Sequence, residues 1–395
     1  MRIRVSQNKR RAAGNLRPRG KNSWELNYKR QRTTIKANSE REAERALAAF
    51  IVDVDKGKFK KPTKLTIEQS IEQHWVRDYA DTNLGVKTAE VYKIYIQSRI
   101  IPAMGHLKLD QVKPQHLLDF YANLREDGIR LDGKPGPLSY ATIQKYHRIL
   151  STIFRCAVEW EYIDENPVKK VKPGKLQKFP PFTLDEMQTA YLLESLNSEK
   201  LKYKVLATMA IFTGMRRGEL LGLTWDSIDI TNGVIFIDKT SQYTTAEGIN
   251  AESNTKTPSS IRYIPLPKTM IPLLKELKID WANQKEKCGD LWVENNLLFR
   301  QWNGNPMHPN TVDTWFNKFR KRIDLPKETT FHDLRHTSAT MMIINGVDVA
   351  TVSSILGHAR ISTTTDYYLG AVETAKKAAI KKLDDLFGEK NTIDE

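Results

Sequence analysis

The chain has 395 residues, and its 62 lysines and arginines against 47 aspartates and glutamates give a formal net charge of +15. This length exceeds one ordinary domain, and the basic surplus favours a polyanionic partner, nucleic acid first and an anionic membrane surface second. No apolar run reaches the ~18 residues that a membrane crossing needs, and Cys156 and Cys288 are too few for a disulfide framework or a cysteine-rich zinc site, so a cytoplasmic protein is expected.

Positive charge is concentrated in the first 36 residues, which hold twelve lysines or arginines and one acid, Glu25. Short strands are predicted at 23–28 and 33–35 around a turn at 29–31, and Ser39 is the expected N-cap of a helix over 40–54. A solvated basic tail is the alternative. The aromatic residues Trp24 and Tyr28 among the basic ones favour a folded DNA-binding unit instead.

A helical region follows a linker at 56–64. Apolar residues recur at intervals of three and four over 67–79, 87–101, 114–125 and 139–161, which predicts an all-helical bundle. Prolines and like charges predict a second linker at 169–178. Basic residues on the polar faces of these helices fit a bundle that lies on duplex DNA, although each alone is an ordinary surface charge: Lys87, Lys93, Arg99, Lys145, His147 and Arg148.

From Pro180 onward the pattern is mixed. Helices are predicted at 184–197 and 203–212, strands at 233–237 and 261–264, and further helices from residue 269. Gly214 can end the second helix, because glycine adopts left-handed dihedral angles without penalty. A new helix beginning near Arg217 would then hold Arg216 in the turn between the two.

Two histidine motifs follow. In the motif HDLR at 332–335, His332 and Arg335 are three residues apart and would share one helix face, so both could meet one phosphate. The motif LGH at 356–358 comes next, and Tyr368 lies ten residues beyond it on an expected short helix. Consecutive helical residues point ~100° apart, so only one of Tyr367 and Tyr368 can face a site.

Together with the motif TGMR at 213–216, these motifs resemble the tyrosine recombinase (phage integrase) family over nearly the whole chain. The resemblance implies a multidomain α+β fold. It implies an arm-type DNA-binding domain at 1–60, with a small three-stranded sheet plus a helix, and an all-α core-binding bundle at 61–173. It implies a catalytic domain at 174–395 that is mainly helical, with a small antiparallel sheet and a C-terminal helical tail.

The resemblance also implies the site residues one by one. Residues 241–253 form a long insertion between the predicted strands, which leaves Lys239 as a rival for the family's hairpin lysine. The matching positions are Arg216 and Arg335 for the two arginines, His332 and His358 for the two histidines, Lys256 for the hairpin lysine, and Tyr368 rather than Tyr367 for the nucleophile.

These groups suit phosphodiester exchange without a metal or a cofactor. Guanidiniums stabilise the charge that develops on phosphate oxygens, and a phenol with a pKa of ~10 needs a base, here His332. By the family's mechanism the attack gives a 3′-phosphotyrosine and a 5′ hydroxyl, with Lys256 protonating the leaving oxygen and His358 bound to the phosphate. Glu219 and Asp333 are too few and too scattered for a two-metal site, and are expected to orient basic groups. The exchanged bonds are similar in energy, so no ATP is implied.

The resemblance thus implies a site-specific recombinase that integrates and excises a prophage or a conjugative transposon. Its partners would be attachment sites in double-stranded DNA, a homotetramer in the synaptic complex, and an excisionase or a DNA-bending accessory protein, in the nucleoid of a bacterial cytoplasm. A chromosome-dimer resolvase, a type IB topoisomerase-like enzyme and a non-catalytic DNA-binding regulator are the alternatives. A C-terminal amphipathic helix would pack on its own domain or on a neighbouring protomer through one apolar side: Ala375, Ala379, Leu383, Leu386 and Phe387.

Overall fold

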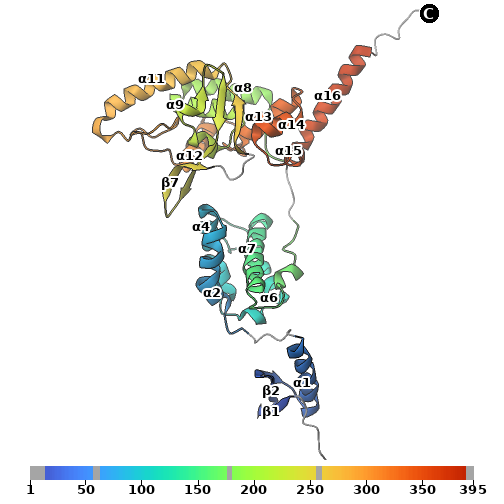
Figure 1. Cartoon of the computed structure of the whole chain (residues 1–395). Helices are drawn as coiled ribbons and strands as arrows, with labels where there is room; N and C mark the ends of the chain where they lie inside the picture. Colours follow the sequence, from blue (N-terminus) through green and yellow to red (C-terminus); the bar gives the residue numbers. More distant parts are fainter. Residues whose placement is uncertain (1–13, 57–62, 176–179, 255–259, 388–395) are drawn as a thin grey trace, which may run out of the picture. The chain divides into compact units, whose positions relative to one another are not determined.

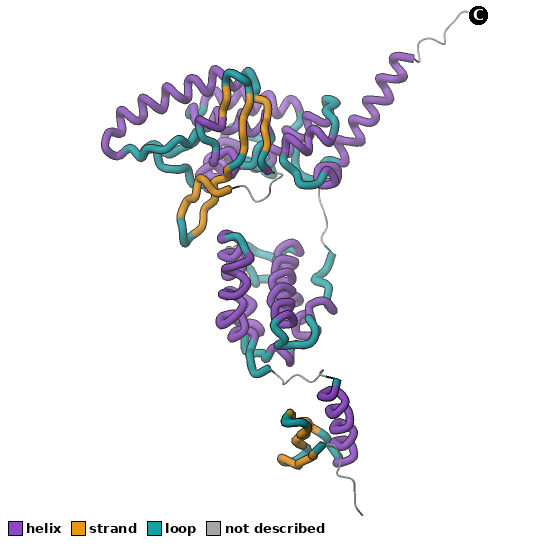
Figure 2. Tube along the Cα trace, viewed as in Figure 1, coloured by secondary structure: helices purple, strands orange, loops and turns teal. Residues whose placement is uncertain are grey.

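The computed structural model describes residues 14–56, 63–175, 180–254 and 260–387 (Figure 1). The chain divides into two compact units, residues 1–176 and 177–395. Figure 2 shows that helices dominate both units and that strands are confined to the N-terminal sheet and to two small groups in the second unit. None of the helices within these four ranges combines the length and the apolarity that a membrane crossing requires.

The first described residues form a three-stranded antiparallel sheet and one helix, as predicted. They are β1 (Asn15–Gly20), β2 (Ser23–Tyr28), β3 (Gln31–Lys36) and α1 (Glu40–Asp55). The backbone of Lys29 and Arg30 has φ of 45° and 65°, and two such left-handed residues form the tight turn of a two-residue hairpin. Because this turn is so short, β3 begins at Gln31, two residues before its predicted start.

The helix α1 is fixed to this sheet by one cap and one small core. Ser39 Oγ accepts a hydrogen bond from the Glu42 N–H at 3.3 Å, which confirms the predicted N-cap. Leu47 and Phe50 of α1 pack on Leu26 of β2, and all three side chains are buried. This part of the chain is therefore folded rather than a solvated tail.

The predicted helical bundle is confirmed. Its helices are α2 (Ile67–Ser70), continued by a π-helical stretch (Ile71–Ala80) and α3 (Asp81–Asn83), then α4 (Val86–Tyr95), continued by a π-helical stretch (Ile96–Ile100) and α5 (Ile101–Met104), then α6 (Pro114–Asn123) and α7 (Tyr140–Glu159). Short 3-10 turns lie at Leu109–Gln111 and Pro167–Lys170. The core is formed around Trp75, Ile149 and Phe154, and Cys156 is buried in it as an ordinary small residue.

The second unit is mixed. Its helices are α8 (Glu186–Ser195), α9 (Leu201–Thr213), α10 (Arg217–Gly222), α11 (Met270–Cys288), α12 (Pro309–Arg322), α13 (Asp333–Ile344), α14 (Val349–Leu356), α15 (Ile361–Tyr367) and α16 (Leu369–Phe387), with 3-10 turns at Leu196–Ser198, Trp225–Ser227 and Gly289–Leu291. Its strands are β4 (Ile228–Asp229), β5 (Val234–Ile237), β6 (Lys239–Thr244), β7 (Gly248–Asn254) and β8 (Arg262–Pro265). Cys288, at the end of α11, is only partly buried.

The strands form two separate antiparallel groups. The sheet has the order β4-β5-β8, in which the two predicted strands pair from Val234 with Pro265 to Ile237 with Arg262. The predicted insertion at 241–253 does lie between these strands in sequence, and most of it forms a second hairpin in which β6 pairs with β7. Its strands were missed because their residues are mostly polar and carry no apolar alternation.

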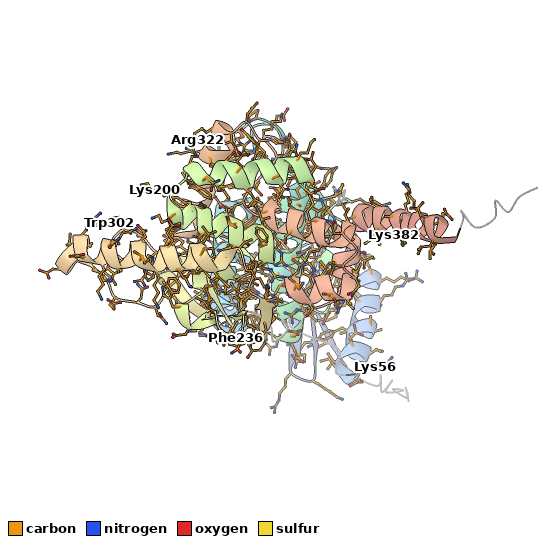
Figure 3. The ribbon with its side chains drawn as sticks, turned by 90° about the horizontal axis from the view of Figure 1, so that it is seen from above. Lys56, Lys200, Phe236, Trp302, Arg322 and Lys382 are labelled. Atoms are coloured by element: carbon orange, nitrogen blue, oxygen red, sulfur yellow. The ribbon has the colours of Figure 1, made fainter. Side chains whose placement is uncertain are left out.

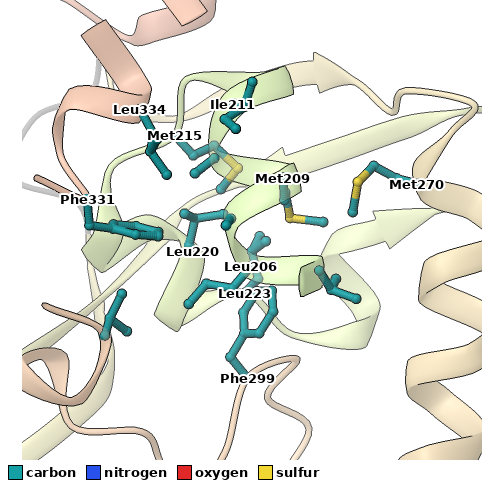
Figure 4. Close-up of a cluster of buried hydrophobic side chains, with 14 of the residues drawn as sticks. Leu206, Met209, Ile211, Met215, Leu220, Leu223, Met270, Phe299, Phe331 and Leu334 are labelled. Carbon is teal, nitrogen blue, oxygen red and sulfur yellow. The ribbon is translucent and has the colours of Figure 1, made fainter. Parts of the chain in front are cut away.

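The main core of the second unit lies between α9 and the elements around it (Figure 4). The helix α9 is buried over most of its surface, from Val205 to Ile211. Figure 4 shows Leu206 and Met209 facing side chains from later elements, Met270 and Phe299. This core fixes the C-terminal end of α9, from which the candidate site is built.

The last helix, α16, leaves the rest of the unit. Its first turns pack through Ala371, Val372 and Ala375 on a small cluster with α13 and α14. Further along, Ile380 and Leu386 are 60% and 65% exposed. Figure 3 shows Lys382 on this outlying part of the helix. The apolar side predicted for α16 is thus covered only near its beginning.

Candidate active site

Arg216 lies in the turn between α9 and α10, as predicted. Gly214 ends α9 with a φ of 62°, in the left-handed region that glycine favours. A Cβ atom at this position would also lie 2.7 Å from a methyl group of Leu356. Arg216 then forms the extended N-cap of α10, so its side chain emerges from the turn rather than from a helix face.

The buried carboxylate of Glu219 joins two arginines. It accepts hydrogen bonds from the Arg216 N–H at 2.9 Å and from Arg216 Nη1 at 2.7 Å. Arg262 of β8 donates to it through Nη1 at 3.2 Å and Nη2 at 2.9 Å. Burial alone would raise the pKa of Glu219, but the bonds and charges of Arg262 and Arg216 hold it below its ordinary value. The expected role of Glu219, orienting a basic group, is confirmed by these contacts.

Three guanidiniums converge on the C-terminal end of α14. Arg262 Nε donates to the carbonyl of Ile355 at 2.6 Å, Arg335 Nη2 to that of Leu356 at 2.9 Å, and Arg216 Nη2 to that of Gly357 at 3.2 Å. The last carbonyls of a helix have no partner within the helix and carry a partial negative charge. The chain thus places its predicted arginines together, although Arg216 and Arg335 are far apart in sequence.

Arg335 is held on a second side as well. Its Nη1 donates to the carbonyl of Gly214 at 2.7 Å, so the guanidinium bridges the end of α9 and the end of α14. The residue is only 3% exposed. Burial and the charge of Arg216 lower the pKa of Arg335, while an arginine stays charged at neutral pH. The neighbouring positive charges of Arg216 and Arg262 make this a place that would favour a negative group.

His358 is fixed by a hydrogen bond at each ring nitrogen. Arg335 Nη2 lies 3.0 Å from Nε2, and the Thr364 hydroxyl lies 2.8 Å from Nδ1. A guanidinium only donates, so Nε2 accepts, and in the neutral ring Nδ1–H then donates to Thr364. Burial and the neighbouring Arg335 lower the pKa of His358 to about 4, which keeps the ring neutral.

Tyr368 is the buried member of the tyrosine pair. It is 3% exposed and Tyr367 is 53% exposed, so the predicted register places Tyr368 inward. Its phenolic oxygen lies 2.7 Å from Nδ1 of His336, a residue of α13. Burial raises the pKa of Tyr368 to about 12, while the charge of Arg335 acts in the opposite direction. The phenol is therefore neutral and lies within the electrostatic influence of the arginines.

His332 lies at the start of α13, one helical turn before His336. It is the N-cap of α13, and its ring meets that of His336 edge to face, with the ring centroids 4.9 Å apart. Together with Arg216, it lines a pocket of about 520 Å³. Asp333 accepts hydrogen bonds from the Thr330 N–H and hydroxyl instead of orienting a basic group, which corrects the expectation for this carboxylate.

The hairpin lysine stays a prediction. Lys256 lies outside the described residues, and its rival Lys239 is the first residue of β6. Within the described parts of the chain, no three His, Cys, Asp or Glu side chains lie together in a way that could hold a metal ion.

Two residues of the site were missed by sequence reasoning. The sequence could have predicted that Arg262 is buried, because strand alternation places it on the same face as the buried Ile264. His336 follows His332 by four residues and therefore shares its helix face. Their partners, however, are 43 and 32 residues away in sequence, and no local pattern encodes such contacts.

Known proteins match this chain over both units. The model of the Phage integrase family matches residues 183–373, and that of the Phage integrase N-terminal SAM-like domain matches residues 69–125. A tyrosine recombinase XerC-like protein of Caldanaerobacter subterraneus subsp. tengcongensis is 31% identical over 320 residues, which are 76% of this chain and 78% of the relative. The ICEBs1 integrase of Bacillus subtilis is 29% identical over 71% of this chain and 73% of its own.

Among solved structures, the Tn1549 transposon integrase in complex with a circular intermediate DNA superposes with a TM-score of 0.66. It is 23% identical, and the match covers 81% of this chain and all of the other. This likeness shows that the two chains share a fold. With the family models and the relative at 31% identity, it leads to one conclusion: the chain belongs to the phage integrase family of tyrosine recombinases.

Proposed function

We propose that this protein is the integrase of a mobile genetic element, a site-specific recombinase that cuts and rejoins double-stranded DNA through a covalent 3′-phosphotyrosine. The observation that carries the proposal is the convergence of Arg216, Arg335 and His358 on one helix end, beside the buried phenol of Tyr368. Similarity to the ICEBs1 integrase and, at 27% identity, to the transposase from transposon Tn916 of Enterococcus faecalis supports the mobile-element role.

The charge of the site suits a phosphodiester. The site holds three guanidiniums and the carboxylate of Glu219, which Arg216 and Arg262 bind and whose charge Arg335 senses, so two positive charges are in excess. A phosphodiester brings one negative charge in the ground state and concentrates more on its non-bridging oxygens under attack. Arginine donors aimed at those oxygens stabilise the attacked state more than the resting one, and loss of one such donor costs ~10² to 10³ in rate.

The reaction needs a bond exchange and two proton transfers. The phenolic oxygen of Tyr368 bonds to phosphorus, its proton passes to an imidazole, and the bond from phosphorus to the 5′ oxygen breaks. Lys256 supplies the proton to the leaving oxygen, and the family resemblance gives the phenol proton to His332. The reverse sequence rejoins the strand with a new 5′ hydroxyl. One ester replaces another of similar energy, so the exchange runs without ATP.

The carboxylates near the site are engaged in other tasks. Glu219 is bound between two arginines, and Asp333 closes the first turn of α13 by accepting from Thr330. A two-metal mechanism needs clustered carboxylates that hold ions ~4 Å apart. The chemistry assigned to this protein therefore rests on its arginines, histidines, lysine and tyrosine.

The remaining parts of the chain serve DNA binding and assembly. Residues 1–60 bind arm-type sites through the basic sheet, residues 61–173 bind the core site, and residues 174–395 carry out catalysis. In the synaptic complex four copies assemble, and α16 offers exposed apolar residues such as Ile380 and Leu386 for a neighbouring protomer. An excisionase or a DNA-bending protein sets the direction, and the bacterial nucleoid is the place of action.

A chromosome-dimer resolvase is the nearest alternative in the same chemistry. The folded sheet with α1, preceded by a strongly basic segment, favours the integrase, because it provides a second DNA-binding element apart from the core site. A plasmid assay with two attachment sites separates site-specific recombination from a topoisomerase activity. Recombinant products support the integrase, whereas relaxation of supercoils without recombinants supports a topoisomerase.

Covalent trapping tests the proposal directly. A DNA duplex with a nick next to the cleavage site releases a short fragment after attack, so the phosphotyrosine complex accumulates and can be seen on a denaturing gel. The expected result is trapping by the wild type and by Tyr367→Phe, and none by Tyr368→Phe. Loss of trapping in Tyr367→Phe alone would move the nucleophile to the exposed tyrosine. Absence of any trapped complex with the wild type on its own attachment site would contradict the function.

A further inference from the structure

His336 of α13 contacts Tyr368, the residue that ends α15. Its Nδ1 lies 2.7 Å from the phenolic oxygen of Tyr368, and the two rings are inclined at 55° with centroids 5.7 Å apart. Tyr367 lies against the same imidazole, with centroids 6.1 Å apart. The contact therefore orients an imidazole at the oxygen that the proposed function makes the nucleophile.

The other two imidazoles of the site have different surroundings. His358 uses both ring nitrogens, one for Arg335 and one for Thr364. His332 meets His336 edge to face and lines the pocket beside Arg216. In the described part of the chain, His336 is the imidazole at hydrogen-bond distance from the phenol.

We propose that His336 accepts the proton of Tyr368 during cleavage and returns it during rejoining. The proposal rests on the proposed function and reassigns a role that the family resemblance gives to His332. As the phenolic oxygen bonds to phosphorus, its proton moves to Nδ1 of His336, and the 5′ oxygen leaves with a proton from the general acid. In the reverse step the 5′ oxygen bonds to phosphorus, and His336 protonates the departing phenolate.

Before cleavage both His336 and Tyr368 are neutral, and the proton leaves Tyr368 only as its oxygen bonds to a phosphate. Burial, and after it the charge of His332, lowers the pKa of His336 to about 4, so the ring is a free base at neutral pH. Burial raises the pKa of Tyr368 to about 12, so the proton stays on the phenol until the bond to phosphorus forms. The titratable and charged groups that face His336 come from its own helix, from α15 and from the loop before it: His332, Asp333, Arg335, His358, Tyr367 and Tyr368.

Two substitutions separate proton acceptance from simple positioning. His336→Asn keeps a polar group near the position of Nδ1 but takes up no proton, and His336→Phe keeps the ring volume without any nitrogen. Both are expected to lower the single-turnover rate of covalent complex formation by ~10² to 10⁴, the usual contribution of a general base. The matched control is Tyr367→Phe, which keeps the ring beside His336 and should retain the wild-type rate.

The pH dependence of the rate of covalent complex formation distinguishes the two roles, because it would not change if His336 only positioned the tyrosine. The wild-type rate should be level between pH 6 and 8, roughly, because the base is already deprotonated there. Without His336, attack depends on free phenolate, so the rate of both variants should rise about tenfold per pH unit below the pKa of Tyr368. A wild-type rate and profile for His336→Asn would overturn the proposal in favour of hydrogen bonding alone.

A DNA substrate with sulfur in place of the leaving 5′ oxygen separates the two proton transfers, because a thiolate leaves without protonation. His336→Asn should stay slow on this substrate, whereas Lys256→Ala should recover. Recovery of His336→Asn would assign His336 to the leaving group and overturn the proposal, as would a wild-type rate for His336→Asn alongside a slow His332→Asn. In each case the wild type still forms the covalent complex, so failure of this proposal is distinct from failure of the proposed function.

Discussion

Arg262 contributes to the site without being one of the groups expected to meet the phosphate. Its guanidinium spans Glu219 and the carbonyl of Ile355, and its side chain is 6% exposed. Glu219 in turn holds Arg216 through both its backbone and its side chain. The position of the first site arginine therefore depends on a buried carboxylate that Arg262 keeps ionised.

Removing Arg262 should destabilise the protein strongly. Arg262→Ala leaves the buried carboxylate of Glu219 with one cation instead of two, and breaking a buried ion pair costs about 3–5 kcal/mol. Chemical unfolding of the full chain at pH 7 should show this loss in the free energy of unfolding. The matched control is Lys285→Ala, which breaks a solvent-exposed ion pair with Glu294 and should cost much less. Equal losses in the two variants would contradict the role given to Arg262.

The same variant has a pH signature. The pKa of Glu219 is lowered in the folded protein, so its ionisation adds stability above the pKa of the unfolded chain, and this stability is lost as the pH falls through the folded value. In Arg262→Ala the folded pKa rises toward or above the ordinary one. As the pH falls, the difference in unfolding free energy between wild type and variant should therefore begin to shrink near or above the ordinary glutamate pKa of ~4.3 and continue to shrink down to the lowered pKa of the wild type. A difference that is constant from pH 3 to 7, roughly, would mean that Glu219 is not its source.

At the residue level, the sequence predicted the motif positions but not their mutual contacts. Local spacing predicted Arg216 in a turn and one inward tyrosine of the pair, the family resemblance selected Tyr368, and the structure places both residues so. The contacts of Arg262 with Glu219 and of His336 with Tyr368 arise only when distant elements pack. Such contacts depend on the whole core, so local spacing gave no reason to include either residue.

Among the elements, α10 and the hairpin β6–β7 approach each other unusually closely. A Cβ atom at Gly222 would lie 3.0 Å from Thr240 Cα and 3.1 Å from the Ser241 nitrogen, which are main-chain atoms that cannot turn aside. A Cβ at Gly218, one helical turn earlier, would lie 2.6 Å from the Thr240 hydroxyl. The two glycines thus let the hairpin lie directly on the helix that begins at Arg217.

Adding a methyl group where the hairpin meets α10 should push the two elements apart. Gly222→Ala is expected to lower the unfolding free energy by about 1–3 kcal/mol, the range for overpacking in a dense interior. Gly370→Ala is the control within the same unit, because a Cβ there meets nothing within 4 Å and alanine is the better helix former. Thermal unfolding should therefore show a lower midpoint for the first variant and an unchanged or higher one for the second. Similar midpoints for both would show that the hairpin can shift freely.

The elements also show which sequence signals are sufficient. Helices with apolar residues at intervals of three and four were predicted near their observed positions, because packing one apolar face is what stabilises them. The hairpin β6–β7 carries a polar sequence, and it is placed by the glycines of α10 rather than by its own alternation. A strand that is stabilised by contact with a neighbouring backbone does not need alternating apolar and polar residues, so its sequence does not reveal it.

At the scale of the whole molecule, the basic N-terminal part should set the salt dependence of DNA binding. Deleting residues 1–60 removes the sheet, α1 and the strongly basic first 36 residues, so fewer phosphates are neutralised. The slope of log affinity against log salt should become less steep by ~0.9 for each phosphate that the shortened protein leaves without a cationic partner. Gel-shift titrations on DNA with and without distal arm sites would measure it. Trapping on a short core-site duplex should persist, while an unchanged affinity and slope would refute an arm-binding role.

The short helix α15 connects two parts of the chemistry. Thr364 holds His358 through its hydroxyl and accepts the Tyr368 N–H at its carbonyl, 3.0 Å away. A displacement of α15 that carried the tyrosine out of one protomer would therefore also take away the support of that histidine. The same movement would withdraw the Tyr368 nucleophile and release His358 from its hydrogen bond to Thr364. A subunit in a larger assembly would then have both groups in place or neither.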